Sequence, residues 1–159
     1  MSRRIVSRRS PIHGNGVFAA VDIPAFTTLI EYKGRLLTHV QADRLYPDNA
    51  DSGHTFLFTL NERYVLDANV DGNIARWINH SCDPNCRALV AEDAQGRAKR
   101  DRILIESIRD IRAGEELAYD YGIVLAQPHT KKLKAIWQCR CGSPHCTGTM
   151  LKPKNGRGG

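Results

Sequence analysis

The sequence predicts a β-rich fold, mostly strands with a few short helices. Short runs of β-branched and aromatic residues recur along the 159-residue chain. Turn residues separate these runs at close spacing, and no helical periodicity persists long enough for a long helix. The chain has no internal repeat. At this length we expect one domain that buries about two-thirds of its unfolded surface.

The predicted elements are short and follow one another closely. Strands are expected at residues 17–20, 28–32, 55–60, 64–67, 88–91, 103–107 and 117–121, and helices at 40–46, 72–78 and 131–137. The first helix follows Thr38, a favoured N-cap residue, and stops before Pro47. Asn61-Glu62-Arg63 separates two strands as a hairpin turn would. Residues 92–102 are predicted to form a charged connection, and residues 152–159 a disordered tail.

The composition is that of a soluble globular protein. Hydrophobic residues make up 42% of the chain and charged residues 25%. No apolar run approaches the length that spans a bilayer, so no membrane partner is expected. The N-terminus, MSRRIVSRRS, lacks the apolar segment of a secretory signal. We expect an intracellular protein, in the cytoplasm or at the nucleus or chromosome. Delivery into a host cell is an alternative if the source is a microbe.

The chain is basic, with 23 Lys and Arg against 17 Asp and Glu and a formal net charge of +6. The excess gathers in four clusters, near residues 3–9, 97–102, 131–134 and 152–157. A solvated surface explains such clusters most simply. Weak, non-specific attraction to nucleic acid is the alternative.

Cysteine usage indicates a metal. Three of the five cysteines, Cys139, Cys141 and Cys146, lie close together near the C-terminus. Without a secretion signal, metal binding is a more common reason for such spacing than a disulfide framework. A closed structural zinc site takes about four ligands. His145 and Cys86 are candidates for the fourth.

Six short motifs stand out. In chain order they are Gly14-Asn15-Gly16-Val17-Phe18-Ala19, Glu31-Tyr32-Lys33-Gly34, Asp67-Ala68 with Gly72-Asn73-Ile74-Ala75-Arg76, the stretch RWINHSCDPNC at 76–86, the stretch GEELAYDYG at 114–122, and Cys139-Arg140-Cys141 with Cys146. Taken singly, each has an ordinary explanation as a turn, a packed strand or a small core residue. Together and in this order they resemble the SET-domain protein lysine methyltransferases that carry a C-terminal post-SET motif. The resemblance extends over about residues 7–148.

The resemblance implies a division of the chain and a fold. Residues 1–122 would form the SET domain, 123–137 a connecting segment, 138–151 the post-SET zinc-binding segment and 152–159 the tail. The family's fold is a set of small sheets in which the chain passes through a loop, a pseudoknot. Threaded chains are rare, so the residues alone would not suggest this feature. The absence of a cysteine-rich region before Gly14 is typical of a minimal, free-standing member.

Lysine methylation places physical demands on such a site. The nucleophile is a neutral amine, yet a lysine with a pKa near about 10.4 is neutral only about one time in a thousand near pH 7.5. The family's methyl donor, S-adenosylmethionine, carries a positive sulfonium. Like-charge repulsion and desolvation both lower the pKa of an amine beside it. The site then needs a narrow aromatic channel and a few oxygens, because catalysis is chiefly positioning.

The resemblance assigns the lysine channel to three tyrosines. Tyr121 matches the catalytic tyrosine whose hydroxyl faces the reacting centre. Tyr119 lies two residues away on the same strand face, at the position that influences how many methyl groups are added. A hydroxyl there leaves less room, which predicts mono- or dimethylation rather than trimethylation. Tyr32 is expected to line the same channel. Ordinary strand packing is the alternative for each tyrosine alone.

The resemblance also implies cofactor contacts. The expected cofactor-binding residues are Gly14, Asn15, Gly16, Arg76, Asn79 and His80. The glycines would let the backbone approach the donor closely, and Arg76 is a candidate partner for the donor's carboxylate. A simple hairpin turn is the alternative for Asn15-Gly16.

The family takes its fourth zinc ligand from the NHSC element. The implied zinc ligands are therefore Cys82, Cys139, Cys141 and Cys146. Such a site would tie the C-terminal segment over the active site and complete the lysine channel. Cys86 is then expected to be a packing residue, and Trp137 either caps the cofactor or packs.

These features predict an enzyme, a zinc-containing, S-adenosylmethionine-dependent protein lysine N-methyltransferase. Its expected partner is a protein that presents a lysine, a histone tail or another basic DNA-associated protein. The sequence predicts no particular oligomeric state. The alternative is a non-catalytic, basic, zinc-containing module that binds nucleic acid or a peptide. Only the charge clusters support that alternative, because the sequence has no recognition helix and no aromatic-rich RNA-binding element.

Overall fold

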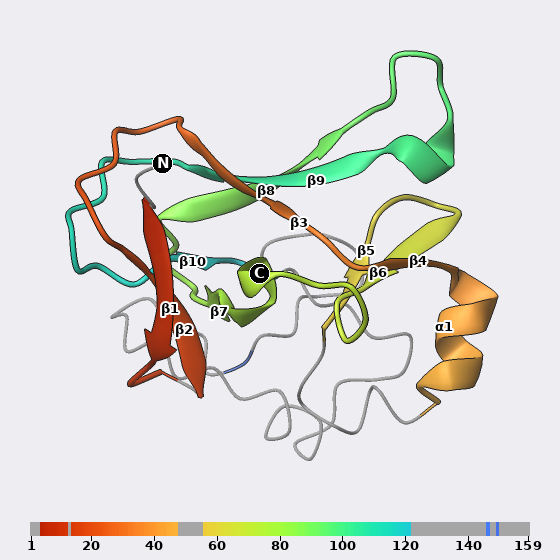
Figure 1. Cartoon of the computed structure of the whole chain (residues 1–159), viewed down its shortest axis with the longest axis horizontal. Helices are drawn as coiled ribbons and strands as arrows, with labels where there is room; N and C mark the ends of the chain where they lie inside the picture. Colours follow the sequence, from red (N-terminus) through yellow and green to blue (C-terminus); the bar gives the residue numbers. More distant parts are fainter. Residues whose placement is uncertain (1–3, 13, 48–55, 122–145, 147–148, 150–159) are drawn as a thin grey trace.

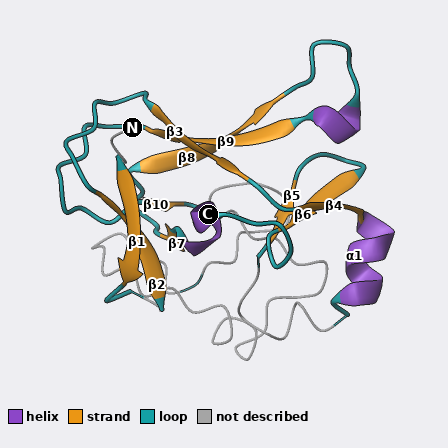
Figure 2. Cartoon of the chain, in the orientation of Figure 1, coloured by secondary structure: helices purple, strands orange, loops and turns teal. Residues whose placement is uncertain are grey.

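The computed structural model describes residues 4–12, 14–47 and 56–121, together with Cys146 and Thr149. Several predicted features lie outside these residues: the connecting segment 123–137 with its helix at 131–137 and Trp137, the zinc-ligand candidates Cys139, Cys141 and His145, and the tail at 152–159. Within the described part, strands dominate and the helices are short, as Figure 2 shows. The predicted β-rich fold is confirmed. None of the helices in these ranges is long and apolar enough to cross a membrane.

The described strands form four small sheets (Figure 1). Two of the sheets have two strands: β1 (Ile5–Arg9) pairs antiparallel with β2 (Asn15–Ala19), and β7 (Asn79–His80) pairs parallel with β10 (Ala118–Tyr119). A three-stranded antiparallel sheet has the order β3 (Thr28–Tyr32), β9 (Arg102–Ser107) and β8 (Cys86–Ala91). The other three-stranded antiparallel sheet has the order β4 (Arg35–Thr38), β6 (Tyr64–Asp67) and β5 (Leu57–Thr59).

The described chain also holds three short helices, α1 (His39–Leu45) and the 3-10 helices η1 (Ile74–Trp77) and η2 (Ala98–Arg100). α1 begins close to its predicted start because Thr38 forms a capping box. The Thr38 hydroxyl accepts a hydrogen bond from the backbone N–H of Gln41 at 3.1 Å, and the Gln41 side chain accepts one from the backbone N–H of Thr38 at 2.9 Å.

Most predicted elements are present, and the differences have physical reasons. The strand at 28–32 and the hairpin of β5 and β6 are confirmed. The helix predicted at 72–78 is the shorter η1. The strand predicted at 117–121 contracts to β10, because β7 offers only two residues for pairing. β1 and β4 were not predicted. β1 is rich in arginine, and its pairing with β2 stabilises it from Ile5 opposite Ala19 to Arg9 opposite Asn15.

One hydrophobic core supports the elements that carry the site. Its largest fully buried hydrophobic side chains are Val17, Ile23, Leu60, Ile78, Ile103, Ile105, Ile111 and Leu117. Ile78 immediately precedes β7, and Leu117 immediately precedes β10, so burial of these two side chains holds both strands against the core. Cys86 lies in the same core, and burial raises the pKa of its thiol to about 12. The expectation that Cys86 is a packing residue is confirmed.

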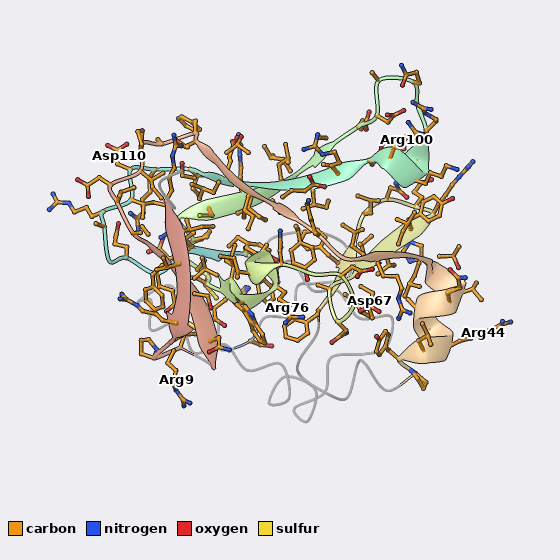
Figure 3. The ribbon with its side chains drawn as sticks, viewed as in Figure 1. Arg9, Arg44, Asp67, Arg76, Arg100 and Asp110 are labelled. Carbon is orange, nitrogen blue, oxygen red and sulfur yellow. The ribbon has the colours of Figure 1, made fainter. Side chains whose placement is uncertain are left out.

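A buried carboxylate joins β4, β6 and the end of α1. Asp67 is fully buried and accepts hydrogen bonds from Arg35 Nη2 at 2.8 Å, from the Tyr46 hydroxyl at 2.8 Å, and from the backbone and side-chain nitrogens of Asn69 at 3.0 and 2.9 Å (Figure 3). Burial alone raises the pKa of Asp67, but these hydrogen bonds outweigh it and hold the pKa below its usual value. This aspartate of the 67–68 motif therefore stabilises the fold.

Candidate active site

The candidate site forms where β7 and β10 lie side by side, left of the centre of the view in Figure 1. The two strands bring together the two longest motifs, at 76–86 and 114–122. Asn79 lies opposite Ala118, and His80 lies opposite Tyr119. The backbone N–H of Ser81 donates to the carbonyl of Tyr119 at 3.2 Å and extends the pairing by one bond. Motifs that are distant in sequence therefore share one small sheet.

The side chain of Asn85 holds this sheet together. Its Nδ2 donates to the backbone carbonyl of Glu116 at 2.9 Å, and its Oδ1 accepts from the backbone N–H of Ala118 at 2.9 Å. The side chain is buried. Because a buried amide that satisfies two backbone groups is costly to remove, Asn85 positions the strand that leads to Tyr119 and Tyr121.

The Tyr121 hydroxyl points back toward the other motif. It donates a short hydrogen bond to the backbone carbonyl of Ile78, immediately before β7. The Tyr121 ring lies 4.9 Å from the Tyr119 ring, centroid to centroid, and 5.3 Å from the His80 ring. The two tyrosines lie on one face, as their spacing predicted. Burial raises the pKa of Tyr121, and nearby Tyr32 and Glu116 add to the effect, so the phenol stays neutral.

Tyr119 and Tyr32 continue the aromatic cluster. Phe58 lies between them, with ring centroids 6.2 Å from Tyr119 and 4.9 Å from Tyr32. The Tyr32 hydroxyl donates to the backbone carbonyl of Phe56 at 3.0 Å. Among the described residues the Tyr119 hydroxyl has no hydrogen-bond partner, although the side chain is largely buried. Burial raises the pKa of both phenols. The three predicted tyrosines are therefore brought into one neighbourhood.

Three of the six predicted cofactor residues, Asn15, Gly16 and Asn79, meet at a polar cluster. The Asn79 Nδ2 lies 2.8 Å from Glu116 Oε2, 3.2 Å from the Ser10 hydroxyl oxygen and 3.3 Å from the Asn15 carbonyl oxygen. Gly16 follows Asn15 in β2, and a Cβ at Gly16 would lie 2.4 Å from Glu116 Oε2. A side chain at this position would have to displace the Glu116 carboxylate or Ser10, so glycine permits their close approach. The hairpin-turn alternative is wrong for Asn15 and Gly16, which lie in a strand, but Gly14 does belong to the turn and has a φ of 49°.

Arg76 lies on η1 with its guanidinium between two aromatic rings. The guanidinium carbon is 4.7 Å from the centroid of Trp77 and 5.6 Å from that of Phe56. Nη1 donates to the carbonyl of Ala68 at 3.0 Å, and within the described chain the buried Nε has no hydrogen-bond partner. Figure 3 shows Arg76 near the middle of the molecule. These contacts hold the Arg76 side chain in place, and its Nε–H remains available to donate a hydrogen bond.

His80 connects the tyrosines to a pair of thiols. The backbone N–H of Tyr121 donates to His80 Nδ1 at 3.0 Å, so the proton of the neutral ring lies on Nε2. Nε2 is 3.6 Å from Cys82 Sγ, which in turn is 4.0 Å from Cys146 Sγ. Two thiolates on a tetrahedral zinc, each with a Zn–S distance of about 2.3 Å, lie about 3.8 Å apart. Cys82 and Cys146 therefore fit two adjacent zinc ligands.

The other predicted zinc ligands, Cys139 and Cys141, lie outside the described residues. Within those residues no group of three or more His, Cys, Asp or Glu side chains is placed to share a metal. Cys86, the alternative candidate for the fourth ligand, is buried in the hydrophobic core.

Sequence reasoning missed three polar residues of the site, Ser10, Asn85 and Glu116. Asn85 and Glu116 were within recognised motifs, but neither had an assigned role. The hydrogen bond between Ser10 and Glu116 joins residues that are 106 positions apart. No local sequence pattern indicates which distant carboxylate the Ser10 hydroxyl meets.

A strand-rich domain with clustered tyrosines at a small parallel sheet agrees with the family comparisons. The family model of the SET domain matches residues 14–122. The chain belongs to the SET-domain family.

Curated relatives and solved structures extend this result. The chain is 38% identical over 149 residues to the "Histone-lysine N-methyltransferase, H3 lysine-4 specific" of Saccharomyces cerevisiae, covering 92% of this chain and 13% of that protein. It is 39% identical over 144 residues to the histone-lysine N-methyltransferase trr of Drosophila melanogaster, covering 89% of this chain and 6% of that protein. A chain of a humanized mutant of the Chaetomium thermophilum Polycomb Repressive Complex 2 superposes on 77% of this chain with a TM-score of 0.65 and 35% identity, over 15% of its own length. The chain thus spans only a small part of these relatives.

Proposed function

We propose that this chain is an S-adenosylmethionine-dependent protein lysine N-methyltransferase whose substrate is a histone tail or another basic protein. Membership of the SET-domain family and relatives named histone-lysine N-methyltransferases support this activity. The strongest structural support is the position of the Tyr121 hydroxyl, which lies at the junction of β7 and β10 and beside Tyr119. A histone substrate corresponds to a location at nuclear chromatin.

The reaction moves a methyl group from a sulfonium to a lysine nitrogen, which loses a proton. The residues of this chain hold the amine and exclude water. Because burial raises the pKa of Tyr32, Tyr119 and Tyr121, no tyrosinate forms that would stabilise the lysine as an ammonium ion. Desolvation among these buried side chains disfavours the ammonium ion and so favours the uncharged, nucleophilic amine. The clustering of the three rings supports the assignment of all three tyrosines to the lysine channel.

Mass spectrometry tests the proposal. The purified protein is incubated with S-adenosylmethionine and core histones, and in parallel with a panel of other basic proteins. The expected result is a mass increase of about 14 Da per methyl group on lysine, absent with Tyr121→Phe. Nucleic-acid binding without transfer to any protein would support the non-catalytic alternative instead.

Replacing Tyr119 by phenylalanine is expected to move the product distribution toward higher methylation. The Tyr119 side chain is largely buried and its hydroxyl has no hydrogen-bond partner among the described residues, so the hydroxyl is available to hold water or the amine. Its removal enlarges the space around a methylated nitrogen. The measurement is the ratio of mono-, di- and trimethylated peptide at equal turnover. Abundant trimethylation by the unmutated protein would contradict the role of Tyr119.

We also infer a structural zinc held by Cys82, Cys139, Cys141 and Cys146. The 4.0 Å separation of the Cys82 and Cys146 sulfurs supports it, as does the Nε2–H of His80 beside Cys82, because metal-bound thiolates commonly accept such hydrogen bonds. Zinc would join the C-terminal segment to the end of β7. The zinc would stabilise the shape of the lysine channel and would take no part in the methyl-transfer step.

Zinc removal is therefore expected to lower turnover at least about tenfold while the melting temperature falls by only a few degrees, because the core of the described domain lies elsewhere. A chelator titration followed by turnover and by circular dichroism measures both. Restoration of activity by added zinc is the control. Complete unfolding on chelation would contradict this separation of site from core.

A further inference from the structure

Glu116 forms the centre of a polar cluster that joins three separate segments. The Ser10 hydroxyl, in the turn after β1, lies 2.7 Å from both carboxylate oxygens. Asn79, in β7, donates from Nδ2 to Oε2 at 2.8 Å. Glu116 itself lies two residues before β10, and its Oε2 lies directly over Gly16 of β2. The carboxylate is partly buried.

This carboxylate differs in charge balance from the other half-buried glutamates of the described residues. Glu31, Glu106 and Glu115 each have an arginine within 4 Å, at Arg102, Arg87 and Arg109 respectively. Among the described residues Glu116 has no cationic partner, and its donors, Ser10 and Asn79, are neutral. A partly desolvated charge without a counter-charge is unfavourable. The site therefore favours a cation brought by a ligand.

The carboxylate also has unused acceptor capacity. An ionised carboxylate offers about four lone-pair sites. One O–H and one N–H from the described residues occupy two of them. The remaining capacity lies next to Gly16 and Asn79, two of the residues expected to contact the methyl donor. The donor carries a sulfonium and an α-ammonium group.

We propose that Glu116 supplies the negative charge that binds the cationic methionine end of the methyl donor. This inference rests on the proposed function, since it names a donor-binding residue of the same site. The competing explanation is that Glu116 only links the β1–β2 hairpin to β10. The two explanations differ in which ligands should lose affinity when the charge of Glu116 is removed.

Isothermal titration calorimetry of the whole chain with three nucleosides tests the proposal. S-adenosylmethionine carries both cationic groups, S-adenosylhomocysteine keeps only the ammonium, and 5′-methylthioadenosine carries neither. Glu116→Gln keeps the shape and removes the charge. The expected result is an affinity loss of about tenfold for the first two ligands and little change for the third. Equal losses for all three ligands, or no loss, would overturn the proposal.

Two further variants separate charge from structure. Glu115→Gln removes the adjacent carboxylate, which faces Arg109 and the backbone N–H of Arg112, and it should leave all three affinities unchanged. Ser10→Ala removes a hydrogen bond of the cluster but keeps the charge, so binding of S-adenosylmethionine should stay within a factor of about three. A loss with Ser10→Ala as large as that with Glu116→Gln would support the purely structural link and overturn the proposal. If the unmutated protein binds none of the nucleosides, the proposed function itself fails.

Discussion

Replacing Tyr121 by phenylalanine is expected to reduce methyl transfer about 10²–10³-fold, the usual effect of removing one positioned polar group from an active site. The hydroxyl is anchored on the carbonyl of Ile78, and its ring packs between Tyr119 and His80. Phenylalanine keeps the ring and loses only the oxygen. Single-turnover transfer to a histone peptide measures the effect, and calorimetry should show nearly unchanged affinity for the methyl donor.

Tyr64→Phe is the matched control for this variant. Tyr64 is a half-buried tyrosine of β6 that packs against the same core, and its hydroxyl has no hydrogen bond to the described residues. Its turnover should remain within a factor of about two. Tyr121→Phe also loses one hydrogen bond, worth about 1 kcal/mol of stability, so both variants are compared at a temperature where each is folded. Retention of more than a third of the turnover by Tyr121→Phe would remove Tyr121 from the catalytic group.

Replacing Asp67 by alanine is expected to lower the free energy of unfolding by about 3 kcal/mol at neutral pH. The substitution leaves Arg35 and the Tyr46 hydroxyl without their shared acceptor and opens space beneath β4. Urea denaturation measures the change. Asp43→Ala, an exposed aspartate of α1, is the control and should change stability by no more than about 0.5 kcal/mol. A change below about 1 kcal/mol for Asp67→Ala would contradict the structural role.

The contribution of Asp67 should also depend on pH in a defined direction. Despite burial, the hydrogen bonds from Arg35, Tyr46 and Asn69 hold its pKa below the usual value of about 4. The folded protein thus binds fewer protons at this group than the unfolded chain. The stability it adds is complete above about pH 4 and is lost as the pH falls through the lowered pKa. The difference between the unmutated protein and Asp67→Ala should therefore be constant near neutrality and shrink in strong acid.

Local sequence determines the parts of this fold that could be predicted. The Asn61-Glu62-Arg63 turn works because Asn61 Oδ1 accepts from the backbone N–H groups of Arg63 and Tyr64 at 2.9 and 3.0 Å. The start of α1 depends on Thr38 and Gln41, three residues apart. β1 and β4 were not predicted because they form strands through pairing with β2 and β6 and not through their own local sequence.

The same distinction applies to the site. Strand alternation predicted that Tyr119 and Tyr121 share one face, and their rings do lie 4.9 Å apart, although β10 ends at Tyr119. No local rule connects Ser10 to Glu116 or Asn85 to Ala118, because side-chain partners across a fold leave no periodic pattern. The motif order indicated the family, and that family pattern carried the assignments of Tyr32, Asn79 and His80, which stay predictions.

The hydrogen bond from Ser10 to Glu116 has a consequence for how the molecule forms during synthesis. When the β1–β2 hairpin leaves the ribosome, the residue that anchors its turn has not yet been made, because it follows 106 positions later. The hydrogen bond between Ser10 and Glu116 cannot form before nearly all of the matched domain has emerged. Loop closures over such separations slow folding into the range of milliseconds to seconds. The site is therefore completed late in folding, when the distant segments that carry Ser10 and Glu116 come together.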